Sequence, residues 1–451
     1  MIKIKAGFVG FGEINSPREL IEKKCRDAKK LLEAAGFELV YTEPVSDDPQ
    51  GADIKRALAE LAGREFDILV VCIAGWIPSY AVISVIDKYR HKPMILWGLA
   101  GYYEEGRLVT TADQAGTTAI RKTMQDMGYN FKFAYGTPGK KPDISKITGF
   151  ALAAAAAERL RECKIGMMGY RDMNLYGTMF EGASLRTKIG TEVEIFEMLE
   201  IVQKIEQLDS AEINRVVEKV KKEWSFSKAP KVETLVTGAK YFLALKEKIL
   251  ERNYAAISLI DVDGMKKLAK FPPSMIMMLL ADELNICTIP ENDTLGSVTQ
   301  LITKFLTGQI GAYLEFYEFM EDRVLMGVPD YVPKEVVDGS IMVEPASFGG
   351  FSEGILNVSR VKTGKVTLCR LIGTGDRYSM HIVTGEAVEP GRWEEAGWAP
   401  PAPQLPGLEI ILDIPVEDFA DKVASQHYII SYGDNTGLFK DFCRLLNIEV
   451  L

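Results

Sequence analysis

The sequence predicts a mixed α/β protein with two doubly wound α/β domains followed by an antiparallel, barrel-like β domain. Two observations support this class. Apolar strand-like runs alternate with amphipathic helical stretches over roughly the first 330 residues, which is typical of βαβ units and a parallel sheet. After Pro329, short apolar runs are separated by turns, as in antiparallel β domains. We therefore predict domains at 1–160, 161–330 and 331–451.

The first domain begins with the strand pattern 6–10, followed by a helix. Ser16, Pro17 and Glu19 predict the start of that helix with a capping box, and Gly36 predicts its end. Further strands are expected at 37–41, 67–73 and 93–99. A long helix rich in alanine is expected at 144–163, as a packed connector.

The second domain restarts the alternation at 164–169, with helices expected near 209–226 and 231–252 and a strand at 255–260. In the third, strands are expected at 339–343, 354–361, 364–371, 378–383 and 408–412. A helix at 435–446 closes the chain, because its apolar residues recur at helical spacing.

Composition narrows the classes of function. The chain has 451 residues, a formal net charge of -10 and no cluster of lysine or arginine, which argues against a nucleic-acid partner. We find no apolar run long enough to span a membrane and no signal segment, so we expect a cytoplasmic protein. The six cysteines show no close ligand spacing and are expected to be reduced thiols of the core.

Several common site motifs are weak or missing. The segment 7–12 has glycines after a strand, but the third glycine of a dinucleotide fingerprint is absent and Glu13 would oppose a pyrophosphate. A plain strand-to-helix turn is the favoured interpretation. No nucleophile elbow occurs, and of the three histidines His91 is expected at a helix end on the surface and His381 inside a strand.

Three residues form the candidate site: Glu291, Glu315 and His427. Two carboxylates and one imidazole suit Mn²⁺ or another divalent cation, with positions left for substrate oxygens. Each also has a structural interpretation, since Glu291 stands at a helix start and His427 at the beginning of an apolar strand. Glu315 lies among apolar and aromatic neighbours, where burying a carboxylate without a cation is costly.

These residues occur in an order that resembles the L-fucose isomerase and L-arabinose isomerase superfamily. The resemblance covers nearly the whole chain and is carried by Phe271-Pro272-Pro273-Ser274-Met275, Glu291-Asn292-Asp293, Glu315, Gln426-His427-Tyr428 and Gly433-Asp434. It implies an aldose–ketose isomerase with Glu291, Glu315 and His427 as ligands of a divalent metal, usually Mn²⁺. It also implies substrate contacts from Gln426 and Trp398, and from Arg18 and Trp76 reaching a neighbouring subunit's site in a homo-hexamer.

The chain also departs from that pattern. It lacks the further histidine that arabinose isomerases carry near 327–330, so the three-ligand fucose isomerase pattern fits better. Gln426 stands where asparagine is expected, and Glu315 where aspartate is expected. The sugar is therefore left open among fucose, arabinose and a modified or anionic aldose.

The residues themselves suggest a chemistry. A metal on O1 and O2 of an open-chain sugar would acidify the C2 proton and stabilise an ene-diolate, while Glu291 and Glu315 act as acid and base. A hydride shift is the competing mechanism. A catalytically silent sugar-binding or regulatory protein, and an epimerase or lyase that shares the ene-diolate, remain alternative functions.

Overall fold

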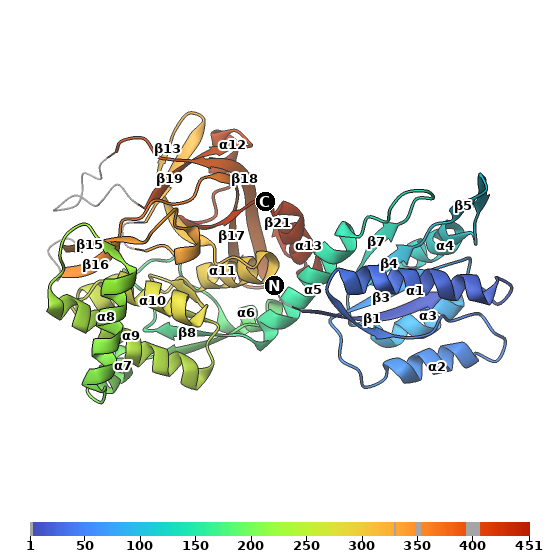
Figure 1. Ribbon diagram of the computed structural model, residues 1–451, viewed down its shortest axis with the longest axis horizontal. Coiled ribbons are helices and arrows are strands. Elements are labelled where there is room, and N and C mark those ends of the chain that lie inside the picture. Colours follow the sequence, from blue (N-terminus) through green and yellow to red (C-terminus); the bar gives the residue numbers. More distant parts are fainter. Residues whose placement is uncertain (1–2, 329–330, 348–352, 394–405) are drawn as a thin grey trace. The chain divides into compact units, whose positions relative to one another are not determined.

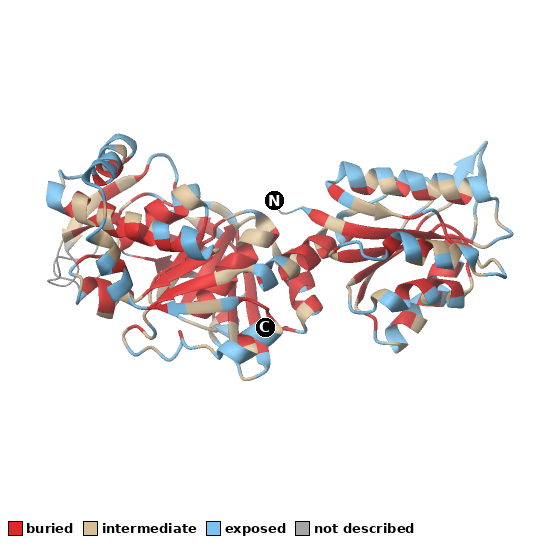
Figure 2. Ribbon diagram, turned by 90° about the horizontal axis from the view of Figure 1, so that it is seen from below, coloured by how far each residue is buried: buried red, intermediate tan, exposed pale blue. Residues whose placement is uncertain are grey.

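The computed structural model describes residues 3–328, 331–347, 353–393 and 406–451 (Figure 1). The chain divides into two compact units, Met1–Glu158 and Arg159–Leu451. In both units the strands are largely buried beneath helices whose outer faces are exposed (Figure 2). Mixed α/β architecture with parallel sheets is therefore confirmed.

The first unit is built on a parallel sheet with the order β2-β1-β3-β4-β7. Its strands are β1 (Ile4–Phe11), β2 (Phe37–Tyr41), β3 (Ile68–Ile73), β4 (Met94–Gly98) and β7 (Phe131–Tyr135). Its helices are α1 (Arg18–Ala34), α2 (Ala52–Leu61), α3 (Ser79–Ile86) and α4 (Asp113–Asp126), with a hairpin of β5 (Tyr102–Glu104) and β6 (Arg107–Val109). Every residue of β3 is buried, as expected for a central parallel strand.

The glycines at the end of β1 and directly after it allow close helix packing. A Cβ atom on Gly10 would lie 2.3 Å from the sulfur of Cys25, and one on Gly12 would lie 2.7 Å from Ile21, both on α1. Close approach of α1 to the strand accounts for these glycines without a dinucleotide, in agreement with the predicted strand-to-helix turn.

The predicted capping box of α1 is absent. The residue at the N-cap is Pro17, and no side chain caps the helix. The helix starts at Arg18, so Ser16 lies one position before the N-cap and Glu19 is at the second helical position instead of the third. The N–H of Ser16 donates to the carbonyl of Glu13 in the preceding turn. The predicted end is confirmed, since Gly36 follows the helix with φ +90°. The long helix predicted at 144–163 is α5 (Ser145–Glu162).

The second unit contains a parallel sheet with the order β12-β11-β8-β9. These strands are β8 (Lys164–Met168), β9 (Glu192–Phe196), β11 (Ala256–Leu259) and β12 (Cys287–Ile289). The helices around them are α6 (Gly182–Lys188), α7 (Met198–Ile205), α8 (Ser210–Glu223), α9 (Val232–Arg252), α10 (Ser274–Leu284) and α11 (Thr294–Thr307).

A separate small sheet joins β10 (Ser225–Phe226), β15 (Met342–Ser347) and β16 (Glu353–Asn357). The segments 339–343 and 354–361 were expected in the C-terminal β domain. Instead, Val343 and Ile355 belong to the same buried cluster as Phe242 of α9 and Met275 of α10. Their apolar side chains thus complete the core of the central α/β part.

The remaining strands form a closed antiparallel barrel, as predicted. Its order within the described residues is β17-β20-β13-β14-β19-β18, and pairing of β17 with β18 closes it. The strands are β13 (Ala312–Phe319), β14 (Arg323–Gly327), β17 (Gly364–Thr374), β18 (Arg377–Val388), β19 (Gly407–Leu412) and β20 (His427–Tyr432). The short strand β21 (Glu449–Val450) pairs with β18, and α12 (Val416–Ala420) and α13 (Thr436–Leu446) complete the chain.

The barrel begins before residue 331. Because β13 and β14 belong to it, Glu315 lies on a barrel strand, although the sequence predicted it within the central α/β domain 161–330. The six cysteines are free, and five of them are buried. In the part of the chain that the structure describes, no helix is both long and apolar enough to cross a membrane.

Candidate active site

Glu315 and His427 face each other across two neighbouring strands. The register of β13 and β20 places them directly opposite one another. The Nε2 atom of His427 lies 3.5 Å from Oε2 of Glu315. His427 is buried, whereas the side chain of Glu315 is 28% exposed, so the pair lies at the barrel surface with its carboxylate open to a ligand.

Glu291 lies in the loop between β12 and α11, in a strained backbone. Glu291 and Asn292 have φ values of +61° and +52°. Residues other than glycine rarely adopt this left-handed backbone conformation. Asn292 anchors this loop to two strand ends, since its N–H binds the carbonyl of Leu259 and its side-chain amide binds the carbonyl of Met168 at 2.9 Å. Such strain is commonly retained at functional sites.

A buried ion pair joins this loop to the barrel. Asp293 caps α11 by accepting the N–H of Gly296, and Arg370 of β17 donates two hydrogen bonds to the same carboxylate, one of 2.9 Å from Nη2. Both side chains are 1% exposed. Burial would raise the pKa of Asp293, but the charge and hydrogen bonds of Arg370 lower it overall.

Tyr313 connects the ion pair to the histidine. Its hydroxyl donates to Asp293 at 2.9 Å, and its ring stacks on His427 with a centroid distance of 4.3 Å. Burial raises the pKa of Tyr313 well above its usual value, and the negative charges of Asp293 and Glu291 raise it further. Tyr313 therefore contacts both the buried ion pair and the imidazole of His427.

The cluster brings two of the three predicted ligands side by side. Among the described residues, no three His, Cys, Asp or Glu side chains stand together at the spacing needed to hold a metal ion. Glu315 and His427 are adjacent, while Glu291 would have to change its side-chain position to join them.

The remaining residues predicted to contact the sugar are Gln426, Trp398, Arg18 and Trp76. Gln426 is exposed directly before β20, and its carbonyl accepts the N–H of Phe316 at 3.1 Å. Trp398 lies outside the described residues. Arg18 and Trp76 lie in the first unit, at the carboxyl ends of β1 and β3, where the strand order reverses; ligands of open α/β sheets often bind at such points.

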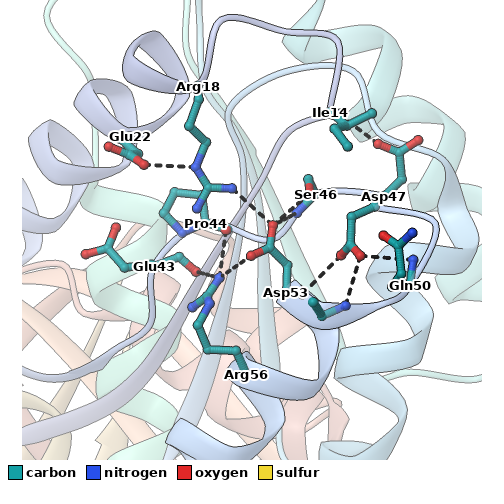
Figure 3. A network of polar contacts seen from close by, with 12 residues as sticks. Ile14, Arg18, Glu22, Glu43, Pro44, Ser46, Asp47, Gln50, Asp53 and Arg56 are labelled. Carbon is teal, nitrogen blue, oxygen red and sulfur yellow. Dashed lines mark hydrogen bonds and ion pairs between the residues drawn. The ribbon is translucent and has the colours of Figure 1, made fainter.

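Arg18 is held in a polar network (Figure 3). Its guanidinium donates to Glu22 at 2.8 Å and to Asp53 at 3.0 Å. Although burial would raise the pKa of Asp53, hydrogen bonds from Ser46 and Arg56 lower it to about 2. Trp76 is 40% exposed, so its ring is accessible.

The other histidines match their predicted structural roles. His91 is exposed after α3. His381 is buried in β18, where Nδ1 lies 2.7 Å from the hydroxyl of Tyr428.

Arg370 and Tyr313 were not predicted as site residues. The signal for Arg370 is present in the sequence, because an arginine within the apolar run 366–372 is costly to bury without a carboxylate. The identity of that carboxylate, Asp293, depends on barrel closure and is not apparent from spacing.

Comparison with known proteins gives distant relatives that cover most of the chain, whereas no family model matches. A sulfoquinovose isomerase of Priestia megaterium is 20% identical over 88% of this chain and 88% of its own length. A sulfoquinovose isomerase of Alkalicoccus urumqiensis is 20% identical over 82% of each chain. An L-arabinose isomerase of Shouchella clausii is 21% identical over 68% of this chain and 64% of its own. Each is named as a sugar isomerase, so the resemblance to the isomerase superfamily predicted from the sequence is confirmed.

Proposed function

We propose that this chain is an aldose–ketose isomerase acting on an open-chain sugar. The observation that carries the proposal is the cross-strand pair of Glu315 and His427 beside the strained loop of Glu291. Similarity to named sugar isomerases along most of the chain supports the same reaction class.

The donor set is chemically suited to a divalent cation such as Mn²⁺. In metal sites, two atoms that bind the same ion lie about 3 Å from each other. Oε2 of Glu315 and Nε2 of His427 are 3.5 Å apart, which is close to that distance. With Glu291 these residues would hold the ion. When bound, it would supply positive charge to polarise the oxygens on the two reacting carbons.

The chain's own residues would then move the proton. One carboxylate takes the proton from C2 of the aldose as the double bond forms between C1 and C2, and O1 is protonated. Return of a proton to C1, with loss of the proton from O2, gives the ketose. Glu291 and Glu315 belong to different elements, β12–α11 and β13, which allows them to approach the substrate from different sides.

The ring of Tyr313 fixes the imidazole of His427, and Asp293 fixes Tyr313. Both contacts limit rotation of the imidazole before substrate arrives, which keeps its nitrogen directed at Glu315.

A screen of aldoses with Mn²⁺, read by ketose formation, tests the proposal. Glu315→Gln and His427→Gln should abolish turnover and weaken Mn²⁺ binding measured directly by electron paramagnetic resonance. Gln309→Ala, a polar change near the other end of β20, serves as the control. Retention of most activity in both site variants would refute the assignment. Deuterium from solvent at C1 of the ketose would favour the ene-diol over a hydride shift.

A further inference from the structure

The first unit contains a cavity to which the proposed reaction assigns no role. It has a volume of about 410 Å³ and lies between α1, the carboxyl end of β4 and the loop that follows β7. All of its lining residues fall between positions 20 and 142, within the first unit, and neither Arg18 nor Trp76 is among them. The volume lies in the range of about 300 to 1,000 Å³ that is typical of sites for small molecules.

The alternation of side chains along β4 places this cavity on the α1 side of the sheet. Leu96 belongs to the buried cluster that contains Ala57 of α2 and Val82 of α3. Its neighbour Trp97 therefore points to the opposite face, where it lines the cavity together with α1. The cavity thus has a helix as one wall and the sheet as its floor.

The wall is largely apolar. Hydrophobic lining residues from α1, β4 and the two loops include Leu20, Ala28, Leu31, Trp97, Leu99 and Pro142. Of the lining residues, only Asp27, Tyr102 and Thr137 carry a side-chain oxygen. Because a sugar has a hydroxyl group on nearly every carbon and each buried hydroxyl needs a partner, this wall suits an apolar molecule better than a sugar.

Three lysines also line the cavity, and two of them are available to a ligand. Lys24 is already paired, because its ammonium group contacts Asp113 and donates to the hydroxyl of Thr111 at 2.9 Å. Lys23 and Lys140 are exposed, and neither forms an ion pair in the part of the chain that the structure describes. Both therefore lie at the solvent-facing rim, where their ammonium groups can bind an anion.

The hairpin of β5 and β6 brings these two lysines near one another. Nζ of Lys23 lies 5.9 Å from the centroid of the Tyr102 ring. The next residue, Tyr103, packs on the loop after β7, since a Cβ atom on Gly139 would lie 3.3 Å from its ring. Gly139 directly precedes Lys140, so both lysines stand beside the same hairpin.

We infer that this cavity binds a small molecule with an apolar body and one anionic head group. The body packs against Leu31, Trp97 and Pro142, and the head group binds the ammonium groups of Lys23 and Lys140. Alkyl carboxylates and alkyl phosphates share this chemistry. The ligand is not a sugar and its site lies wholly in the first unit, so the inference does not depend on the proposed isomerase activity.

Calorimetric titration of the full chain with ligands of equal chain length tests the inference. The probes are octanoate, octyl phosphate and 1-octanol, which share an alkyl body and differ in head group, together with D-glucose. At least one anion should bind at a single site, about fivefold or more tightly than 1-octanol, and glucose should not compete with it. Comparison of the two anions shows whether the site prefers a carboxylate or a phosphate.

Variants of the lining residues locate the binding site. Lys23→Gln combined with Lys140→Gln should bring the affinity for the anions to that for 1-octanol and leave 1-octanol binding within about twofold. Ala100→Leu, a larger side chain in the wall, should weaken all three alkyl ligands about tenfold or more. Lys55→Gln is the matched control and should change no affinity, because Lys55 is an exposed lysine of α2 outside the lining.

Three results would overturn the inference. They are no measurable binding of either anion, binding of 1-octanol as tight as that of both anions, and an anion preference that persists in the double lysine variant. Unchanged binding in an Ala100→Leu chain that circular dichroism shows to be folded would also overturn it, since the ligand would then lie elsewhere. If Ala100→Leu does not fold, the double lysine variant decides alone, because both lysines are exposed.

Discussion

Replacing Arg370 by methionine should strongly destabilise the unit that contains the barrel. The variant leaves the carboxylate of Asp293 buried, with the N–H of Gly296 and the hydroxyl of Tyr313 as its hydrogen-bond donors. It removes two charge-assisted hydrogen bonds and the opposite charge. Breaking one side of a buried pair costs about 3 to 5 kcal/mol, so we expect a loss of that size in the free energy of unfolding.

Urea denaturation followed by tryptophan fluorescence and circular dichroism measures the effect as a lower transition midpoint at unchanged slope. Adding Asp293→Asn to Arg370→Met removes the uncompensated charge, so the double variant should be about 1 to 3 kcal/mol more stable than the sum of the single variants predicts.

Arg323→Met is the matched control on the same barrel. Arg323 also contacts two carboxylates, at 2.8 Å and 3.0 Å, but its side chain is 30% exposed. Exposed pairs contribute little, so the control should lose much less stability than Arg370→Met. If Arg370→Met were as stable as this control, the reasoning that the buried pair joins α11 to the barrel would be refuted.

Three further outcomes follow from individual residues. Burial lowers the pKa of His381 to about 4, whereas an unfolded histidine titrates near 6.5, so its stabilising effect is complete above pH 6.5 and is lost as the pH falls toward 4. Denaturation of wild type and His381→Leu across that range should differ in pH dependence by up to about 3 kcal/mol, whereas the exposed-site control His91→Gln should match wild type. Because Glu291 has φ +61°, Glu291→Gly should be about 1 kcal/mol more stable than Glu291→Ala, with both inactive; equal stability would contradict backbone strain. Tyr313→Phe keeps the stacked ring but loses the hydroxyl bond to Asp293, so kcat should fall while KM changes little, and Tyr313→Leu should reduce kcat further.

Local patterns predicted most of the elements. The helices expected near 209–226 and 231–252 are α8 and α9, and the strand expected at 255–260 is β11, with ends that differ by at most three residues. These predictions are correct because the hydrophobic period and the turn residues act over short stretches of chain. Short apolar runs separated by turns also predicted that the C-terminal part forms an antiparallel, barrel-like β domain.

The pairing of strands that are far apart in the sequence could not be predicted from these short-range patterns. Val343 and Ile355 have strand patterns, but only the surrounding helices decide that they complete the central core instead of the barrel. Glu315 was predicted in the central domain because the boundary was drawn after Pro329, whereas its strand pairs with β20, more than a hundred residues later. The capping box of α1 failed for a local reason, the shift of the helix start by one residue.

The candidate site depends on three features that no short motif contains. The register of β13 and β20 sets Glu315 opposite His427, and a slip of one residue would turn one side chain to the other face of the sheet. The strained turn of Glu291 is anchored to β8 and β11 through Asn292. Asp293 and Arg370 then fix this turn against the barrel, so the distance between the two halves of the site is set by the buried pair. It follows that Arg370→Met should reduce activity by more than the fraction of chain it unfolds, because molecules that remain folded also lose the contact that positions Glu291 relative to His427.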